Sequence, residues 1–190
     1  MKRKTDFILG MVFAAATVIF IIVFLTNDAF FEWAFRRHHN ILSWYIRPLF
    51  IIPIVIFAYK KSLTGIFASI FALFTSMFWF PVPASVNPRV LEFLAFEMDY
   101  LKGPWTSWKI IISLSVPLFF FMLLTAAWKR NWKWLLGVIT GAALLKFIWS
   151  IAFSGEAGLS VLKPALIGLI VCIGAICYLY IRHKRSPKNF

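Results

Sequence analysis

The chain has 190 residues, of which 62% are hydrophobic and 14% are charged, and its formal net charge is +13. Soluble domains carry about 25% charged and about 45–50% apolar residues, and a chain of this length cannot bury so large an apolar excess in a core of its own. The composition therefore excludes an ordinary soluble domain and predicts an integral membrane protein. Its spans are expected to be helices, because the apolar runs lack the alternation of a β-barrel.

Six apolar runs divide the chain into an all-α bundle, a single transmembrane domain covering residues 1–190. Each run is long enough for a helix that crosses a bilayer core of about 30 Å. The first run is followed by no small-residue cleavage site, so we expect an uncleaved helix and not a signal peptide. The predicted spans are Phe7–Thr26, Ile41–Tyr59, Leu63–Phe80, Ile110–Trp128, Trp134–Phe153 and Val161–Ile181.

Between the third and fourth spans, the sequence predicts a short amphipathic outer helix over about residues 88–102. Asn87 can cap its start, and Gly103 followed by proline ends it. At 100° per residue Glu97 falls at the edge of the apolar face. We expect this helix to lie on the bundle, with Glu97 either pointing inward or reaching water at the rim. The opposite, polar face carries Arg89, Glu92 and Asp99.

The distribution of charge favours cytoplasmic N- and C-termini in a bacterial plasma membrane. Basic residues cluster in short segments at the ends of apolar runs, and all acidic residues except Asp6 lie in the other segments. This placement also excludes a nucleic-acid-binding role for the positive charge. Aromatic residues crowd the outer boundary, which predicts an interfacial belt. The basic clusters are Lys2–Lys4, Lys60–Lys61, Lys129–Lys133 and Arg182–Lys188, and the belt includes Phe31, Trp33, Phe35, Trp44, Trp79, Trp105 and Trp108.

Four short strings resemble those of small polytopic membrane proteins of bacteria. They are LSWYIRPLF at residues 42–50, FAYKKSL at 57–63, SMFWFP at 76–81 and EFLAFE at 92–97. The resemblance implies a six-helix membrane class over most of the chain and implies no activity. The size and number of spans are also similar to those of substrate-capture subunits of vitamin importers, which need a partner subunit for transport. Their small-residue stripe on the first helix is matched loosely by Gly10, Ala14, Ala15 and Ala16.

Two cations interrupt the apolar spans. Arg47 lies thirteen residues before Lys60, and Lys146 lies thirteen residues after Lys133, so both are expected about 20 Å above the cytoplasmic edge. A cation near the middle of a membrane costs about 2.5–3.5 kcal/mol, and such residues usually face the bundle interior and find a partner. The candidate partners are Glu97 and Glu156.

These charges support three functional hypotheses. In the first, an outward-facing pocket lined by Arg47 and Lys146, with Glu97 and Glu156, binds or transports a small anionic or zwitterionic solute or a lipid headgroup. In the second, the charges form structural salt bridges, or Arg47 snorkels alone, in a structural or regulatory subunit. In the third, Glu97 or Glu156 serves a membrane-embedded enzyme, although the chain carries no recognisable catalytic motif.

The sequence predicts no cofactor, no metal ligand set and no catalytic residue. A metal site at His38 and His39, with Asp28 or Glu32, is considered and not adopted, because adjacent histidines point to different sides of most backbones. The expected partners are the lipid bilayer and either a membrane partner subunit or a second copy of the chain.

Overall fold

The computed structural model describes residues 3–185, and that part of the chain is helical and contains no strand. The predicted all-α class is therefore confirmed. Lys2 and Lys188, which belong to the predicted basic clusters, lie outside the described residues. The elements in chain order are α1 (Arg3–Thr26), α2 (Asp28–His38), α3 (Leu42–Leu49), α4 (Ile51–Tyr59), α5 (Leu63–Thr75), η1 (Ser76–Phe78), α6 (Pro88–Lys102), α7 (Ser107–Ser113), α8 (Ser115–Trp128), α9 (Trp132–Ser154), η2 (Gly155–Val161) and α10 (Leu162–Arg185).

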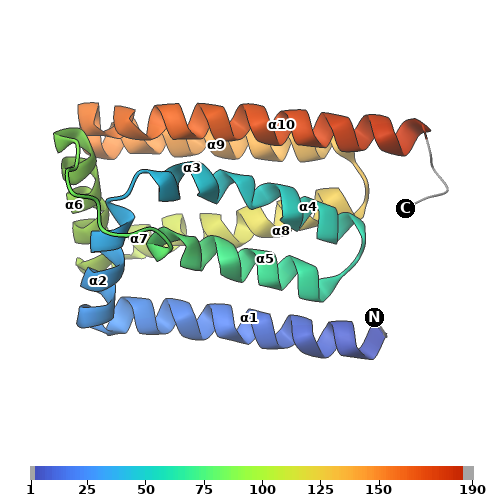
Figure 1. Ribbon diagram of the computed structural model, residues 1–190, viewed down its shortest axis with the longest axis horizontal. Helices are drawn as coiled ribbons and strands as arrows, with labels where there is room; N and C mark the ends of the chain where they lie inside the picture. The colour runs from blue at the N-terminus through green and yellow to red at the C-terminus, as the bar shows by residue number, and fades with distance from the viewer. Residues whose placement is uncertain (1–2, 186–190) are drawn as a thin grey trace.

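The long helices run side by side, and successive ones point in opposite directions (Figure 1). The start of α1 and the end of α10 lie at one end of the molecule, which we call the base, and α2 and α6 lie across the other end, which we call the cap. Four stretches are long and apolar enough to cross a membrane, while Leu63–Phe78 is apolar but shorter. The four are Arg3–Thr26, Leu42–Tyr59, Ser107–Trp128 and Trp132–Arg182, the last of which contains both α9 and α10.

Two of these stretches are broken near prolines. The second breaks at Phe50, between Pro48 and Pro53, and the third breaks at Leu114, three residues before Pro117. Each proline lacks the N–H that would continue the helix and crowds the carbonyl four residues earlier. The breaks separate a short segment near the cap from a longer one near the base.

The helix α10 packs closely against the break between α3 and α4. A Cβ on Gly168 would lie 2.4 Å from the Pro48 Cβ, so only glycine allows this approach. The Cys172 thiol donates a hydrogen bond of 3.2 Å to the Pro48 carbonyl. The break is therefore held in place by α10 and is not left exposed.

The helix α2 occupies the segment between the first two predicted spans, where the sequence indicated only a helical pair of Glu32 and Arg36. Asn27 caps it by accepting a hydrogen bond from Phe30 N–H at 2.9 Å. The buried residues Phe31, Ala34, Phe35 and His38 follow the i, i+3, i+4, i+7 spacing of a single helical face. The prediction of an interfacial belt is correspondingly wrong for three aromatic residues, since Phe31, Phe35 and Trp44 are buried.

The buried apolar residues form two separate clusters. The basal cluster lies toward the base and contains Ile51, Ile54, Val55, Ala58, Ile66, Ile70, Leu123, Ala126, Ala127, Leu135, Val138, Ile139, Cys172 and Ile176. The cap cluster contains Phe24, Phe31, Ala34, Phe35, Trp44, Met77, Val90, Phe93, Leu94, Ala157 and Val161.

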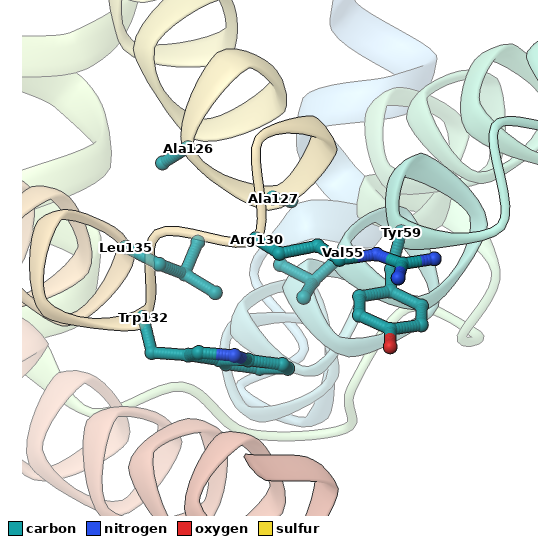
Figure 2. A pocket seen from close by; sticks show the side chains of 7 residues that line it. All are labelled: Val55, Tyr59, Ala126, Ala127, Arg130, Trp132 and Leu135. Atoms are coloured by element: carbon teal, nitrogen blue, oxygen red, sulfur yellow. The ribbon is translucent and has the colours of Figure 1, made fainter. Parts of the chain in front are cut away.

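Two similar turns close the bundle at the base. Lys61 after α4 and Arg130 after α8 both adopt left-handed backbone conformations, with φ of 58° and 56°. Each of these cations lies over an aromatic ring of the other turn, Lys61 over Trp128 at 5.7 Å and Arg130 over Tyr59 at 4.3 Å. Figure 2 shows Arg130 above Tyr59 beside a shallow hollow, which is lined by Val55, Tyr59, Ala126, Ala127, Arg130, Trp132 and Leu135.

The carboxylate of Asp6 fastens α1 to the start of α5. It accepts hydrogen bonds from Ser62 Oγ at 2.8 Å, from Leu63 N–H at 2.8 Å and from Thr64 N–H at 3.3 Å. The Thr64 hydroxyl returns a bond of 2.9 Å to the Asp6 carbonyl. A negative charge at the first turn of α5 also satisfies N–H groups that the helix itself leaves unpaired.

Replacing Asp6 by Asn should lower the Tm of the protein in detergent by a few degrees, because the amide loses the charge and offers a single acceptor oxygen to the start of α5. Glu32→Gln, which removes a charge from an exposed position of α2, is the matched control and should leave Tm unchanged. Equal Tm values for both variants, measured by thermal unfolding, would show that the contact between Asp6 and α5 does not stabilise the fold.

Candidate functional site

Arg47 lies on the face of α3 and α4 that is buried in the bundle. It follows Ser43 by four residues and precedes Ile51 and Ile54 by four and seven, and all three are buried. Those spacings place the four side chains on one helical stripe. Arg47 itself is half-buried and falls between Trp44 of the cap cluster and Ile51 of the basal cluster.

Lys146 lies on the same helical stripe as the buried residues of α9, as Arg47 does on α3 and α4. It follows Ile139 by seven residues and Leu135 by eleven, and it precedes Ser150 by four, and all three of these residues are buried. Lys146 itself is exposed. Its place on this stripe alone therefore does not bury Lys146.

Glu97 continues the buried stripe of α6. It follows Val90, Phe93 and Leu94 by seven, four and three residues, and these three are the buried residues of that helix. The sequence left open whether Glu97 points inward or to the rim, and the half-buried Glu97 lies on the inward side. The polar face of α6, with Arg89, Glu92 and Asp99, is exposed as expected.

In the structure, the charged groups of Arg47, Lys146 and Glu97 are close enough to interact electrostatically. The Glu97 carboxylate attracts both cations, and the two cations repel each other. Among the described residues, however, neither cation lies within 4.0 Å of a carboxylate oxygen. The three charges therefore interact electrostatically but form no salt bridge with one another. Their sum is one positive charge.

The fourth predicted residue, Glu156, is not brought to the two cations. It is exposed in η2, and its carboxylate lies 4.0 Å from the Arg89 guanidinium on α6. An exposed pair at that separation contributes little to stability. Its position between α6 and the turn that joins α9 to α10 makes it part of the cap surface.

His38, which the sequence suggested only for a metal site that was not adopted, contacts Arg47 directly. Its Nε2 lies 3.4 Å from Arg47 Nη1, and its Nδ1 lies 2.9 Å from Ser43 Oγ. The Ser43 hydroxyl donates its one proton to the Asn40 carbonyl at 2.8 Å. It must therefore accept from Nδ1–H, which leaves the Nε2 lone pair to accept from Arg47. The helical spacing from Phe31 to His38 was the signal that could have revealed this buried position.

The environment keeps His38 neutral. Burial of the imidazole, together with the fields of Arg47, Lys146 and His39, holds the pKa of His38 well below its usual value near 6.5, and only the Met77 carbonyl acts in the opposite direction. A neutral imidazole fits the assigned hydrogen bonds, because a protonated ring would present a second N–H to the guanidinium. His38 thus orients Arg47 without adding charge to the site.

The described part of the chain shows no cluster of side chains that could bind a metal ion. Residues 3–185 contain no group of three His, Cys, Asp or Glu side chains placed to hold an ion. Cys172 is buried, while Cys177 on the same helix is exposed, and both are free thiols.

No family model matches the chain, and no curated protein or solved structure is significantly similar to it. The resemblance of the four strings to bacterial polytopic proteins is therefore not strengthened by these comparisons, and function has to be argued from the charged site itself.

The stability of the protein should fall as the pH is lowered from about 7 to about 5. In this range the unfolded chain takes up a proton at His38 as the pH passes about 6.5, whereas the folded protein keeps His38 neutral. The unfolded state is then favoured by up to about 1.4 kcal/mol per pH unit.

Thermal unfolding of His38→Gln should show a smaller dependence on pH over the same range, and His39→Gln, in a half-buried neighbour, should keep the wild-type dependence. Indistinguishable pH profiles for the wild type and His38→Gln would contradict a neutral, buried His38.

Proposed function

We propose that this chain is a six-span protein of the bacterial plasma membrane that binds, and in a transport cycle carries, a small anionic or zwitterionic solute or a lipid headgroup. The ligand site consists of Arg47, Lys146 and Glu97, and it faces outward. The observation that carries the proposal is the convergence of three charged side chains, each on the buried stripe of a different helical segment, with one positive charge left uncompensated.

The count of six spans rests on two features of the fold. The stretch Trp132–Arg182 folds back on itself, since α9 and α10 lie side by side in opposite directions (Figure 1), and so supplies two crossings. The shorter stretch Leu63–Phe78 has 13 α-helical and 3 3-10 residues, which gives a length of about 25 Å. A span of that length crosses a bilayer core after modest local thinning.

The proposed orientation places the base in the cytoplasm. Of the described lysines and arginines, ten lie at the base, among them Lys60, Lys61, Lys129 and Arg130, against six at the cap. The cap elements α2, α6 and η2 also hold every described carboxylate except Asp6. Asp6, the exception, accepts hydrogen bonds from residues at the start of α5. This asymmetry follows the positive-inside rule.

A purely structural role for the charges is the alternative. It requires close ion pairs, because a buried charge is stabilised only by a nearby partner with satisfied hydrogen bonds. Among the described residues neither cation has a carboxylate oxygen within 4.0 Å, which favours a ligand-binding role over a structural one. Arg47 offers a two-pronged hydrogen-bond donor to a carboxylate or phosphate, and Lys146 adds a point charge.

Labelling of single cysteines tests the orientation. In a Cys172→Ala, Cys177→Ala background, Glu92→Cys on the exposed face of α6 should react in intact cells with a membrane-impermeant maleimide. Lys60→Cys at the base should react only after the membrane is opened. The reverse pattern would contradict the proposed topology.

Removal of the Lys146 charge tests the site. Inorganic phosphate, acetate and glycine, added in turn to the purified protein, should identify an anion or zwitterion that raises Tm, and choline should have no effect. At one hundred times its Kd such a ligand stabilises the folded state by about 2.7 kcal/mol. Lys146→Met should fold and lose this response, because half of the cationic pair is gone.

Lys163→Met, which removes an exposed lysine at the cap end of α10, is the matched control and should respond as the wild type does. If Lys146→Met unfolds at a much lower temperature and no added anion stabilises the wild type, the structural alternative is correct.

A further inference from the structure

The imidazole of His38 is held in place by contacts on several sides. The residue is 4% exposed, and the centroid of its ring lies 6.1 Å from that of Phe35 and 5.9 Å from that of Trp44. The Trp44 indole donates a hydrogen bond of 3.1 Å to the His38 carbonyl. The buried Ser43 hydroxyl lies 2.9 Å from Nδ1 and accepts its proton. The position and the tautomer of the ring are therefore set by the protein around it.

This fixed ring contacts the guanidinium of Arg47 at one nitrogen, Nη1, which lies 3.4 Å from Nε2. Among the described residues this is the only hydrogen bond that the Arg47 side chain makes. Every fully enclosed side-chain nitrogen in the described part of the chain has a hydrogen-bond partner. The Nε and Nη2 atoms of Arg47, which have none there, are therefore not fully enclosed.

The identity of the contacted nitrogen decides which part of the guanidinium stays available. Arginine binds a carboxylate or a phosphate most firmly through two parallel N–H groups. One such pair consists of Nε–H and the Nη2–H beside it, and Nη1 takes no part in this edge. A contact at Nη1 therefore restrains the guanidinium and leaves its Nε–Nη2 edge unused.

We infer that His38 is the positioning residue of the proposed anion site and holds Arg47 so that its Nε–Nη2 edge binds two oxygens of one carboxylate or phosphate group. This inference rests on the proposed function and narrows its ligand to an oxyanion, as opposed to a monatomic anion. Two oxygens on one centre match two parallel N–H groups, whereas a halide offers a single acceptor. Lys146 attracts either kind of anion as a point charge and adds no such selectivity.

A neutral imidazole suits this role because it accepts a hydrogen bond without carrying charge. A carboxylate in its place would also restrain Nη1, but it would cancel the positive charge that remains after Glu97 and would compete with the ligand. A protonated imidazole would turn an N–H toward the guanidinium and repel it. Restraining a long side chain before the ligand arrives also reduces the conformational entropy that binding must overcome.

The selectivity can be tested with the purified full-length protein in detergent by isothermal titration calorimetry. The probes are three compounds with carboxylate or phosphate groups, namely acetate, glycine and inorganic phosphate, and one monatomic anion, bromide. At least one of the three should bind the wild type about tenfold more tightly than bromide. Arg47→Lys keeps the charge but lacks the two-pronged edge, and should bring these affinities within about threefold of each other.

Two substitutions of His38 separate positioning from packing. His38→Leu fills the same space without an acceptor and should weaken binding of the oxyanion about tenfold. His38→Gln offers an amide oxygen near the place of Nε2 and should keep the affinity within about threefold of the wild type. His39→Leu is the matched control and should bind as the wild type does, since His39 is half-buried and its Nδ1 contacts the Phe35 carbonyl of its own helix at 2.8 Å.

A double-mutant cycle shows whether His38 acts through Arg47. In an Arg47→Lys background, His38→Leu should change the remaining affinity less than about twofold, because no two-pronged edge is left to orient. A residue that only supports the fold would weaken binding equally in both backgrounds, and that result would overturn the inference.

NMR of the histidine ring nitrogens gives a second measurement, which decides the matter even where His38→Leu does not fold. In the wild type, His38 should carry its proton on Nδ1, and Nε2 should be unprotonated and accept a hydrogen bond. A proton on Nε2 would overturn the inference, since such a ring cannot accept from Arg47.

The failure of this inference can be told apart from the failure of the proposed function. If His38→Leu binds the oxyanion as the wild type does, while Lys146→Met does not bind it, the anion site stands and the role of His38 is refuted. If bromide binds as tightly as the oxyanions, the two-pronged edge is not the binding element. If the wild type binds none of the three oxyanion compounds, the proposed function fails and this inference fails with it.

Discussion

The arrangement of the helices follows from the free-energy cost of holding two cations, Arg47 and Lys146, inside apolar spans. A cation at the middle of a membrane is tolerated only where it faces protein or water and where opposite charge is near. The fold meets this requirement by placing Arg47 and Lys146 between two hydrophobic clusters and by laying α6 across the cap so that Glu97 reaches their level. The neutral imidazole of His38 then fixes the guanidinium by hydrogen bonding, and it adds no further positive charge. The cap is therefore a part of the charged site and not only a connection between spans.

The two ends of the bundle are held together by different contacts. At the base, paired turns exchange cation–π contacts, Asp6 fastens α1 to α5, and the basal cluster contains residues with almost no exposed surface, such as Ile54, Ala126 and Leu123. Toward the cap, the breaks near Pro48 and Pro117 divide two spans. Only one of the two outer segments is held against the bundle, by Gly168 and Cys172 of α10 at Pro48. The other, α7, is tied instead to the end of α6 by Lys109.

The sequence predicted the helices well because long apolar runs and strong breakers determine them locally. The outer helix was predicted from Asn87 and Gly103, and it begins and ends where those residues place it. The shared depth of Arg47 and Lys146 followed from counting residues, since helical rise is uniform. Their mutual field, the inward direction of Glu97 and the separation of Glu156 depend on how the helices are rotated and packed, which no local pattern specifies. The helix α2 was missed because its face of Phe31, Ala34, Phe35 and His38 is only eight residues long and resembles an interfacial aromatic segment. With that helix missed, the role of His38 could not be found.

The asymmetry between the ends constrains how a ligand reaches the charges. A continuous path across the membrane would have to pass through the basal cluster, where side chains from α4, α5, α8, α9 and α10 interdigitate. Interiors packed in this way rearrange between discrete states and do not deform gradually. In the proposed function a ligand would therefore reach the charges from the cap half, and its transfer to the base would require the paired base turns to separate.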